Sequence, residues 1–436
     1  MAITELTDAL AVEHKILACV HCGLCLEACP TYTLTGNEND SPRGRIYLMR
    51  AVVEGKLAGN SATFQTHIDR CLGCRACEPV CPAGVEYGQL LEVSRESLFK
   101  PDVPRGVSYR LLRLALRHVW LHPARLRFAF SSARLMRDLG MAKPLRMLVG
   151  TLSSRMQFGL ALLESSAPQL DVDAPTAASP EAEAGASSRS NGTNLFTGCV
   201  TAGLFARVNE ATRRVLRVNG YSVRSPKGQV CCGALHAHAG DLEGARILAR
   251  QNIQAFEAAG NDPIITNAGG CGAMLVSYGH LFAGDPSFAT RAKKFGARVR
   301  DISQQLEGLE IKKGAPLAAT PVTYDASCHL LNGQHAAEAP LKLLRAIPDL
   351  NIVPLEGAER CCGGAGVYNL LEPAMSAGVL EEKLRHVRET GAEILATGNG
   401  GCQMQIGAGA RLSGLDLKVC HPIELLDESY RLGGLY

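Results

Sequence analysis

The sequence predicts an α+β protein in which a helical N-terminal domain precedes a duplicated α/β body rich in cysteine. Three observations support this fold class. The spacing C-x₂-C-x₂-C-x₃-C-P occurs twice near the N-terminus. A stretch at 165–193 holds Pro, Ala and Ser but no aromatic residue, and a cysteine pattern beyond it recurs after about 130 residues. With 436 residues, 46% of them hydrophobic, the chain is long enough for two or three domains with buried cores.

The cysteine content and the net charge indicate in which compartment the protein works and which kinds of partner it binds. Seventeen cysteines would suggest disulfides in a short secreted chain, but the opening MAITELTDALAVEHK has neither the basic nor the apolar region of a signal peptide. We therefore expect a cytoplasmic chain whose thiols stay reduced, so that clustered cysteines are metal ligands. No run approaches 18 apolar residues, which predicts no transmembrane helix. The net charge of +3 gives no case for nucleic acid as a partner.

The two N-terminal motifs predict two 4Fe–4S clusters in a domain spanning residues 1–100. Both fit the run found in bacterial ferredoxins, whose fourth cysteine ligates the other cluster. The first cluster is predicted to take Cys19, Cys22, Cys25 and Cys81. The second is predicted to take Cys71, Cys74, Cys77 and Cys29. The alternative, a pair of zinc sites, usually shows two C-x₂-C pairs with a longer gap.

The 41 residues between the two motifs predict a helical insert. In NDSPRGRIYLMRAVVEGK, Ser41 is a suitable N-cap, with Pro42 at the first helical position. Ile46, Met49 and Val53 share one face of that helix. Gly55 can end it. The region resembles the helical ferredoxin domains of respiratory iron–sulfur subunits.

Two arginines on the same helix, Arg43 and Arg45, have two interpretations. They either balance the negative charge of a thiolate-ligated cluster or dock a partner, or they belong to a solvated helix face. The pattern alone leaves both open.

Residues 101–164 predict a basic helical connector. From Arg105 to Arg146 there are ten Lys or Arg residues and one acid. In VSYRLLRLALRHVW, one side of a helix is apolar and the other basic; the apolar side holds Leu111, Leu114, Ala115, His118 and Val119. Such a helix either lies in an anionic membrane interface or packs on a neighbouring domain. We favour packing, with a flavin-bearing or membrane partner for the charge. His118 and His122 have no ligand-like companions.

Residues 165–193, SSAPQLDVDAPTAASPEAEAGASSRSNGT, predict a flexible linker. The segment holds three prolines, many Ala and Ser residues and no aromatic residue, so it cannot bury enough surface to fold. We therefore expect the C-terminal half to be a separate body.

That C-terminal half contains an internal duplication, with repeats predicted at 194–310 and 311–436. The first set of cysteines is Cys199, Cys231, Cys232 and Cys271. The second set is Cys328, Cys361, Cys362 and Cys402. The offsets between matching motifs are 129, 130 and 131 residues, which indicates duplication rather than coincidence.

Each repeat has the sequence pattern of an α/β unit. DPIITNAGGCGAML and AEILATGNGGCQMQI each predict a short buried strand, a glycine-rich turn and the start of a helix. Cys271 and Cys402 would then lie at a helix N-terminus, where the helix dipole favours the thiolate. We expect at least one set to hold a further cluster or a zinc ion, the alternative being buried, inert cysteines. Cys420 has no counterpart in the first repeat and is predicted to be structural.

The paired motifs in ACVHCGLCLEACPTY and CLGCRACEPVCP, the segment SPRGRIYLM and the two CCG repeats together resemble the iron–sulfur subunits of bacterial glycolate dehydrogenase, also called glycolate oxidase. The resemblance covers nearly the whole chain. It implies an electron-transfer subunit without activity of its own, which accepts electrons from a partner that binds FAD and oxidises a 2-hydroxy acid. It also implies delivery of those electrons to the quinone pool, from a peripheral position on the inner face of the cytoplasmic membrane.

Related architectures leave other functions to be weighed. The iron–sulfur subunit of anaerobic glycerol-3-phosphate dehydrogenase, D-lactate dehydrogenases and heterodisulfide reductases share parts of this pattern. In heterodisulfide reductases each repeat ends in C-x₂-C, whereas Met274 and Gln405 stand at those places here. That departure argues against a catalytic disulfide reductase, and the ferredoxin motifs argue against a zinc scaffold. No G-x-G-x-x-G motif followed by an acidic residue marks a dinucleotide site.

Overall fold

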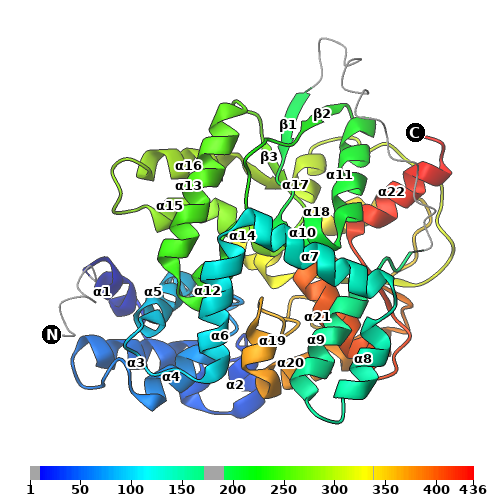
Figure 1. Ribbon diagram of the computed structural model, residues 1–436. Helices are drawn as coiled ribbons and strands as arrows, with labels where there is room; N and C mark the ends of the chain where they lie inside the picture. Colours follow the sequence, from blue (N-terminus) through cyan, green and yellow to red (C-terminus); the bar gives the residue numbers. More distant parts are fainter. Residues whose placement is uncertain (1–9, 171–190, 337) are drawn as a thin grey trace.

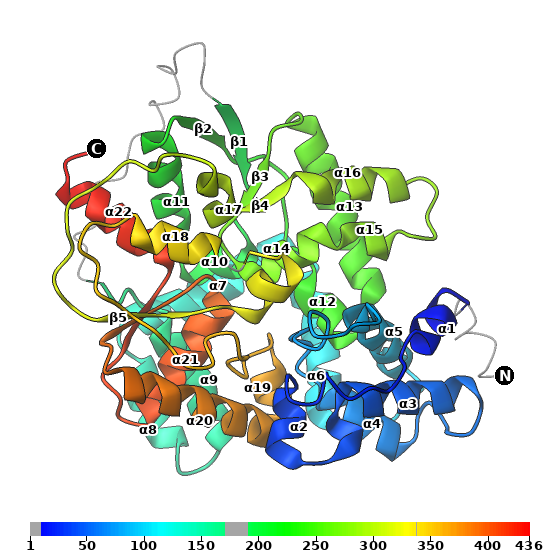
Figure 2. The same ribbon diagram turned by 180° about the vertical axis from the view of Figure 1, so that it is seen from behind.

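The computed structural model describes residues 10–170, 191–336 and 338–436 (Figure 1). The N-terminal helices lie at one end of the molecule, the two cysteine-rich repeats form the rest, and the connector helices run across one face (Figures 1 and 2). Among the described residues, no helix is both long and apolar enough to cross a membrane.

The N-terminal domain is helical, as the insert between its motifs predicts. Its helices are α1 (Leu10–Leu17), α2 (Pro30–Thr35), α3 (Pro42–Val53), α4 (Ala62–Asp69) and α5 (Tyr87–Phe99). The predicted start of α3 is confirmed, because the Ser41 side chain accepts a hydrogen bond from the Gly44 amide and Pro42 opens the helix. Its end is confirmed too, since Gly55 follows in a left-handed conformation with φ 70°. Ile46 and Met49 are buried in the core of this domain.

The connector is helical, but its apolar face differs from the predicted one. It comprises α6 (Val107–Ala115), a π-helical turn (Leu116–Trp120), α7 (Pro123–Asp138), α8 (Ala142–Val149) and α9 (Ser154–Ser165). Leu111 and Leu114 are 60% and 56% exposed, so the prediction that they pack on a domain is wrong. Leu116 is buried instead, and Tyr109 and Leu112 are partly covered. Because Leu112 lies about 100° around the helix from Leu111, a small rotation of α6 exchanges the covered leucine, and periodicity alone could not choose it.

Two four-stranded parallel sheets form the repeats. The first, in the order β2-β1-β3-β4, contains β1 (Asn191–Leu195), β2 (Tyr221–Arg224), β3 (Ile264–Thr266) and β4 (Val299–Asp301). The second, in the order β6-β5-β7-β8, contains β5 (Val322–Asp325), β6 (Ile352–Val353), β7 (Ile394–Thr397) and β8 (Lys418–Cys420). The identical strand order confirms the predicted α/β duplication.

Helices cover both sheets. Those of the first repeat are α10 (Cys199–Leu204), α11 (Ala206–Val218), α12 (Ala234–Ala239), α13 (Leu242–Ala258), α14 (Gly269–Val276), α15 (Tyr278–Leu281), α16 (Ala289–Arg298) and α17 (Ile302–Glu307). Those of the second are a π-helical turn (His329–Gly333), α18 (Ala339–Arg345), α19 (Tyr368–Leu371), α20 (Pro373–Thr390), α21 (Gly400–Leu412) and α22 (Pro422–Leu432).

The two repeats share one core rather than folding as isolated units. A single buried cluster contains Leu195 and Phe205 of the first repeat together with Tyr324 and Ile423 of the second. At the junction, the Gly269 amide donates to the Gly398 carbonyl at 2.9 Å. The repeats therefore stabilise one another directly.

The predicted linker is structured at both ends. α9 includes Ser165, whose hydroxyl donates to the Met404 carbonyl at 3.0 Å, and Ser166 is fully buried. At the other end, β1 begins at Asn191. The prediction of flexibility is thus wrong for 165–170 and 191–193, because Ser165 is hydrogen-bonded, Leu170 packs against the shared core and β1 pairs with β2. Residues 171–190 lie outside the described residues.

Candidate functional site

The first group of N-terminal thiols surrounds a cavity between the two motifs. Cys19, Cys22 and Cys25 lie on the loop between α1 and α2, and Cys81 of the second motif lines the same cavity. Cys77 also borders it. Three cysteines of one motif thus lie with the fourth cysteine of the other.

A second cavity has the reciprocal composition. Cys71, Cys74 and Cys77 line it together with Cys29 from the first motif. Tyr87, at the start of α5, borders both cavities, and its hydroxyl lies 3.6 Å from Cys71 Sγ. The two thiol groups are therefore neighbours on either side of one tyrosine.

The two loops share an unusual backbone. The third residues of the C-x₂-C-x₂-C runs are His21 (φ 53°) and Gly73 (φ 64°), and the fifth are Gly23 (φ 91°) and Arg75 (φ 61°). A left-handed conformation costs a non-glycine residue about 1–2 kcal/mol. Its recurrence at matching positions shows that both loops wind in the same way, around sites of the same kind.

Arg45 supplies a buried positive charge beside the second cavity. Its side chain is fully buried, its Nε donates to the His67 carbonyl at 2.6 Å, and Nη1 lies 4.0 Å from Cys29 Sγ. Burial alone would lower the pKa of Arg45, but the thiol groups of Cys71 and Cys29 raise it above its usual value. The open question about the helix arginines is thereby answered for Arg45, which is no part of a solvated face.

Arg43 has a different role. It pairs with Glu38 at 2.6 Å and donates from Nη1 to the His21 carbonyl at 3.1 Å, so it braces the first cysteine loop from outside. The sequence pattern left open whether these two arginines balance a cluster, dock a partner or belong to a solvated face.

The donor sets fit iron–sulfur clusters. Burial raises the pKa of Cys74 and Cys77 well above the usual thiol value, and neighbouring thiols raise it further. Four thiolates can share such a cavity only if a cation compensates their charge, and the irons of a cluster supply that charge. The Gly73 amide, 3.4 Å from Cys71 Sγ, is one of the donors that stabilise cluster sulfurs.

The cysteines of the first repeat form two close pairs. Cys199 Sγ lies 3.4 Å from Cys231 Sγ, and Cys232 Sγ lies 3.4 Å from Cys271 Sγ. The backbone of the Cys-Cys dipeptide is held from α13 and α15, because Asn252 donates to the Cys231 carbonyl at 3.0 Å and Tyr278 donates to the Cys232 carbonyl at 2.8 Å. The four thiols thus converge on one point at the carboxyl edge of the sheet.

Protonation is unequal within this first set. Hydrogen bonds from Cys199 and Cys232 lower the pKa of Cys231 well below the usual thiol value. The same contacts, with burial, raise the pKa of Cys199 and Cys232 well above it. Deprotonation is therefore easier at Cys231 than at Cys199 or Cys232.

The second set is similar in position but more loosely paired. Cys328 Sγ lies 3.9 Å from Cys361 Sγ, and the Gly363 amide lies 3.4 Å from Cys361 Sγ. Cys402 is in the first turn of α21, where the Asn399 side chain donates to its sulfur at 3.3 Å.

The expectation that the helix dipole would favour thiolates at helix starts is wrong for Cys402. Its pKa is raised well above the usual value, by hydrogen bonding to Cys362 and by burial. Cys199, the first residue of α10, also has a raised pKa. Burial among other thiols outweighs the dipole at both places.

The second repeat contains a buried Lys–Asp ion pair, whereas the buried pair near the thiols of the first repeat is His236–Asp241, at 2.9 Å. Lys383 of α20 and Asp325 of β5 are both almost fully buried, with Nζ 2.7 Å from Oδ1. Lys383 also donates to the Gly357 carbonyl at 2.7 Å. In the motif of the first repeat, L-F-T-G-C, Phe196 stands where Asp325 stands in Y-D-A-S-C. The ion pair was not foreseen, and an Asp at the end of a buried strand is the signal that could have indicated it.

The second set also adjoins the N-terminal domain. Cys74 packs in one small cluster with Cys328 and Cys361. Around it, the His329 ring nitrogen Nε2 lies 3.0 Å from the Gly73 carbonyl, and Asn332 donates to the Cys74 carbonyl at 3.0 Å. The second N-terminal cavity and the thiols of the second repeat are therefore directly adjacent.

Of the remaining residues singled out by sequence, Met274 packs in one buried cluster with Cys231 and Cys232, and Gln405 adjoins Gly363 and Gly364. Met274 and Gln405 are buried in α14 and α21, where they fill the positions of a possible further cysteine. Cys420 is buried in β8, and burial raises its pKa well above the usual value. His118 is exposed, and His122 precedes α7 without a side-chain capping bond.

Comparison with known protein families identifies the domains. A 4Fe-4S dicluster domain matches residues 15–85, and a cysteine-rich domain matches residues 193–276 and again 322–407. Together with the four-thiol cavities, these matches define an iron–sulfur protein with a dicluster domain and two cysteine-rich repeats.

Relatives of similar length identify the particular family. The chain is 38% identical over 423 residues to the probable glycolate oxidase iron-sulfur subunit of Bacillus subtilis, covering 96% of this chain and 94% of that protein. It is 32% identical over 439 residues to the glycolate oxidase iron-sulfur subunit of Escherichia coli, covering 98% of each. The chain belongs to the family of glycolate oxidase iron–sulfur subunits.

A shorter relative matches part of the chain. Lactate utilization protein A of Oceanobacillus iheyensis is 35% identical over 245 residues, which cover 56% of this chain and 98% of that protein.

Proposed function

We propose that the chain is the electron-transfer subunit of a glycolate dehydrogenase, in which a separate FAD-binding subunit oxidises the 2-hydroxy acid and quinone is the final acceptor. The proposal is supported above all by the two neighbouring four-thiol cavities, each with three cysteines from one motif and one from the other. When bound, 4Fe–4S clusters supply one-electron transfer and no substrate site. The chain itself is expected to have no glycolate-oxidising activity.

The ligand assignment follows the grouping of the thiols. One cluster is assigned to Cys19, Cys22, Cys25 and Cys81. The other is assigned to Cys71, Cys74, Cys77 and Cys29. Buried Arg45 offsets the negative charge of the second site, and the Gly73 amide and Tyr87 hydroxyl donate toward its sulfurs. These groups favour the thiolate form that iron requires.

A third carrier site is assigned to the cysteines of the second repeat. Because Cys74 packs against Cys328 and Cys361, a metal group held there would adjoin the second N-terminal cluster. The four thiols suffice for one ordinary cluster or a zinc ion. A cluster would extend the electron route into the repeats, whereas zinc would leave that route within the N-terminal domain.

Reconstitution tests the division of labour. Purified anaerobically, the chain alone should not reduce an artificial acceptor with glycolate, D-lactate or glycerol 3-phosphate. Addition of the flavin subunit should restore activity with glycolate. Turnover by the chain alone would refute the proposal, and restoration only with D-lactate or glycerol 3-phosphate would assign it to one of those dehydrogenases.

A cysteine variant tests the crossed ligands separately. Cys29→Ser should remove about four of about eight N-terminal irons and disturb the cluster of Cys71, Cys74 and Cys77 rather than that of its own motif. Cys420→Ser, at a buried cysteine in β8, is the control and should retain all iron and acid-labile sulfide. Zinc without sulfide in the wild-type protein would contradict the assignment.

A further inference from the structure

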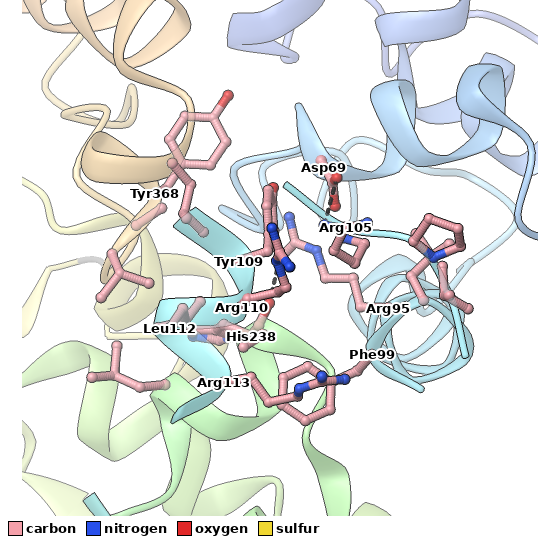
Figure 3. A pocket seen from close by; sticks show the side chains of 18 of the residues that line it. Asp69, Arg95, Phe99, Arg105, Tyr109, Arg110, Leu112, Arg113, His238 and Tyr368 are labelled. Carbon is pink, nitrogen blue, oxygen red and sulfur yellow. Dashed lines mark hydrogen bonds and ion pairs between the residues drawn. The ribbon is translucent and has the colours of Figure 1, made fainter. Parts of the chain in front are cut away.

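A cavity of about 370 Å³ lies between the N-terminal domain, α6 and the repeats, apart from the thiol sites (Figure 3). Phe99 of α5, Leu112 of α6, His238 of α12 and Tyr368 of α19 contribute to its walls. Its volume is at the lower end of the range for small-molecule pockets, which suits a single ring system rather than a whole dinucleotide.

One side of the cavity is rich in hydrogen-bond donors. Arg105 pairs with Asp69 at 2.7 Å, and its guanidinium lies 3.8 Å above the ring of Tyr109, which also lines the cavity. The Arg105 side chain is only 10% exposed, and its Nη1 has no hydrogen-bond partner among the residues that the structure describes. A buried N–H left unpaired is costly, so this donor indicates a ligand that brings an acceptor oxygen.

The rest of the wall is apolar. Leu98, Phe99, Leu235, Val367 and Leu371 line it together with Leu112. A small carboxylate would satisfy the arginines but leave this apolar surface uncovered. A planar apolar ring with carbonyl oxygens at its edge satisfies both sides.

The position of the cavity connects it to the second thiol site. Leu72, which lines the cavity, is the residue between Cys71 and Gly73 in the cysteine loop. Arg95 lines it as well, and its guanidinium donates to the Cys71 carbonyl at 2.5 Å and to the His238 carbonyl at 2.9 Å. A ligand here would therefore contact the loop of Cys71 through Leu72.

An apolar surface continues outside the cavity on the same helix. Leu111 and Leu114 of α6 are 60% and 56% exposed, next to the cavity residues Leu112 and Arg113. A hydrophobic tail attached to the ring can therefore leave along α6 without entering the protein core.

We propose that this cavity binds the head group of a quinone, with a carbonyl oxygen toward the unpaired Nη1 of Arg105 and its tail along α6. The inference rests on the proposed function, because it needs a one-electron carrier at Cys71, Cys74 and Cys77. Each quinone takes up two electrons, delivered singly by the reduced iron–sulfur protein, and two protons from solvent to form the quinol.

Binding of decylubiquinone to the full-length, anaerobically purified protein tests the proposal without any turnover. Isothermal titration in mild detergent should find one site in the wild-type protein. Leu112→Trp fills the cavity and should weaken binding at least about tenfold. Arg105→Lys keeps a positive charge for Asp69 but removes the unpaired Nη1 donor, and it should weaken binding about fivefold, which keeps the test valid if the larger substitution misfolds. The control is Leu148→Trp on α8, whose side chain is 70% exposed, and it should bind within twofold of wild type.

Each outcome decides between hypotheses. Equal affinity in Leu112→Trp and Leu148→Trp would overturn the proposal, as would binding of acetate or glycolate at this site with no binding of quinone. If the wild-type protein holds its full iron and sulfide but does not bind quinone, this inference is refuted and the proposed function is not. Quinone binding by a protein that holds no iron–sulfur cluster would refute the proposed function alone.

Discussion

The two cysteine-rich repeats have the same strand order and four cysteines each, yet they differ in what surrounds those cysteines. In the first repeat the thiols form two pairs, each 3.4 Å apart, and neutral Asn252 and Tyr278 support the backbone. In the second, a buried Lys383–Asp325 ion pair lies beside the thiols and Cys74 of the N-terminal domain packs against them.

The two copies of the duplicated fold therefore place the same four thiols in different surroundings. The fold that presents four thiols at the carboxyl edge of a sheet is retained in both copies. The second set contacts Cys74 of the N-terminal domain, so a metal group held there would adjoin the second N-terminal site. In the first set the pKa of Cys231 is lowered, and His236, which pairs with Asp241 at 2.9 Å, is one of the groups that lower it. The following predictions test whether the asymmetry extends to metal binding, charge and capping.

The largest effect is expected from removing a thiol of the second set. Cys362→Ala should abolish metal binding there and lower the melting temperature, because structural metal sites contribute about 10 kcal/mol or more to folding. Metal analysis and thermal unfolding measure both quantities. Cys232→Ala is the matched variant in the first repeat. An equal loss of metal from both variants would mean that the repeats are equivalent in occupancy, and rapid reaction of all eight thiols in the native protein would mean that both sets are empty.

The buried ion pair should give the next largest effect. Lys383→Met leaves Asp325 buried without its partner and should lower the free energy of unfolding by about 3–5 kcal/mol. Chemical denaturation measures the change. Lys342→Met breaks a surface pair with Glu307 and should cost less than about 1 kcal/mol. If Lys383→Met were as mild as this control, the buried pair would not stabilise the second repeat. The double variant with Asp325→Leu should recover most of the loss.

The last helix of each repeat begins with a capping box. The pKa values of the two capping residues, Asp301 and His421, are shifted in opposite directions. In the first repeat Asp301 accepts from the Ser303 amide at 2.9 Å, and burial raises its pKa to about 6. In the second, His421 Nδ1 accepts from the Ile423 amide at 3.0 Å, and burial lowers its pKa to about 3.

Because the pKa values of His421 and Asp301 differ between the folded and unfolded states, the stability of the protein depends on pH through both residues. A histidine with a lowered pKa contributes stability above its unfolded pKa of about 6.5, and this is lost as pH falls. At pH 5 the loss at His421 should be about 2 kcal/mol relative to pH 7. Asp301, with a raised pKa, should gain stability as pH falls from about 6 to about 4. Unfolding measured across this range should show a smaller acid loss in His421→Asn and a larger one in Asp301→Asn. The same pH dependence in both variants would contradict the assigned protonation states.

The smallest effect concerns the neutral support in the first repeat. Tyr278→Phe removes the hydroxyl that donates to the Cys232 carbonyl and should lower the free energy of unfolding by about 1 kcal/mol. Tyr324→Phe, in β5 of the second repeat, is a matched substitution at another buried tyrosine. We expect Tyr278→Phe to change the reactivity of the first set of thiols more than Tyr324→Phe does. Equal changes in the two variants would contradict the supporting role assigned to Tyr278.

Several features of the fold could be predicted because they depend on local sequence. The Ser41 cap, the Pro42 start and the left-handed Gly55 follow from rules that involve a few neighbouring residues. The duplicated α/β pattern follows from strand, turn and helix signals that occur twice. The buried side of α6 and the ordered ends of the predicted linker could not be predicted, since both depend on which distant surfaces are available for packing.

The sequence by itself determined the chemistry of this protein. Eight N-terminal cysteines at fixed spacings, two four-cysteine sets and the absence of a recognisable dinucleotide motif specify an iron–sulfur protein, because thiol number and spacing fix which groups can be ligated. Only the tertiary structure decided the neighbourhood of each site: that Arg45 is buried beside Cys29, that Cys74 adjoins the second repeat and that Arg105 faces a cavity next to the Cys71 loop. These contacts join residues far apart in sequence, and burial and pairing of charge over such distances depend on packing that local pattern does not encode.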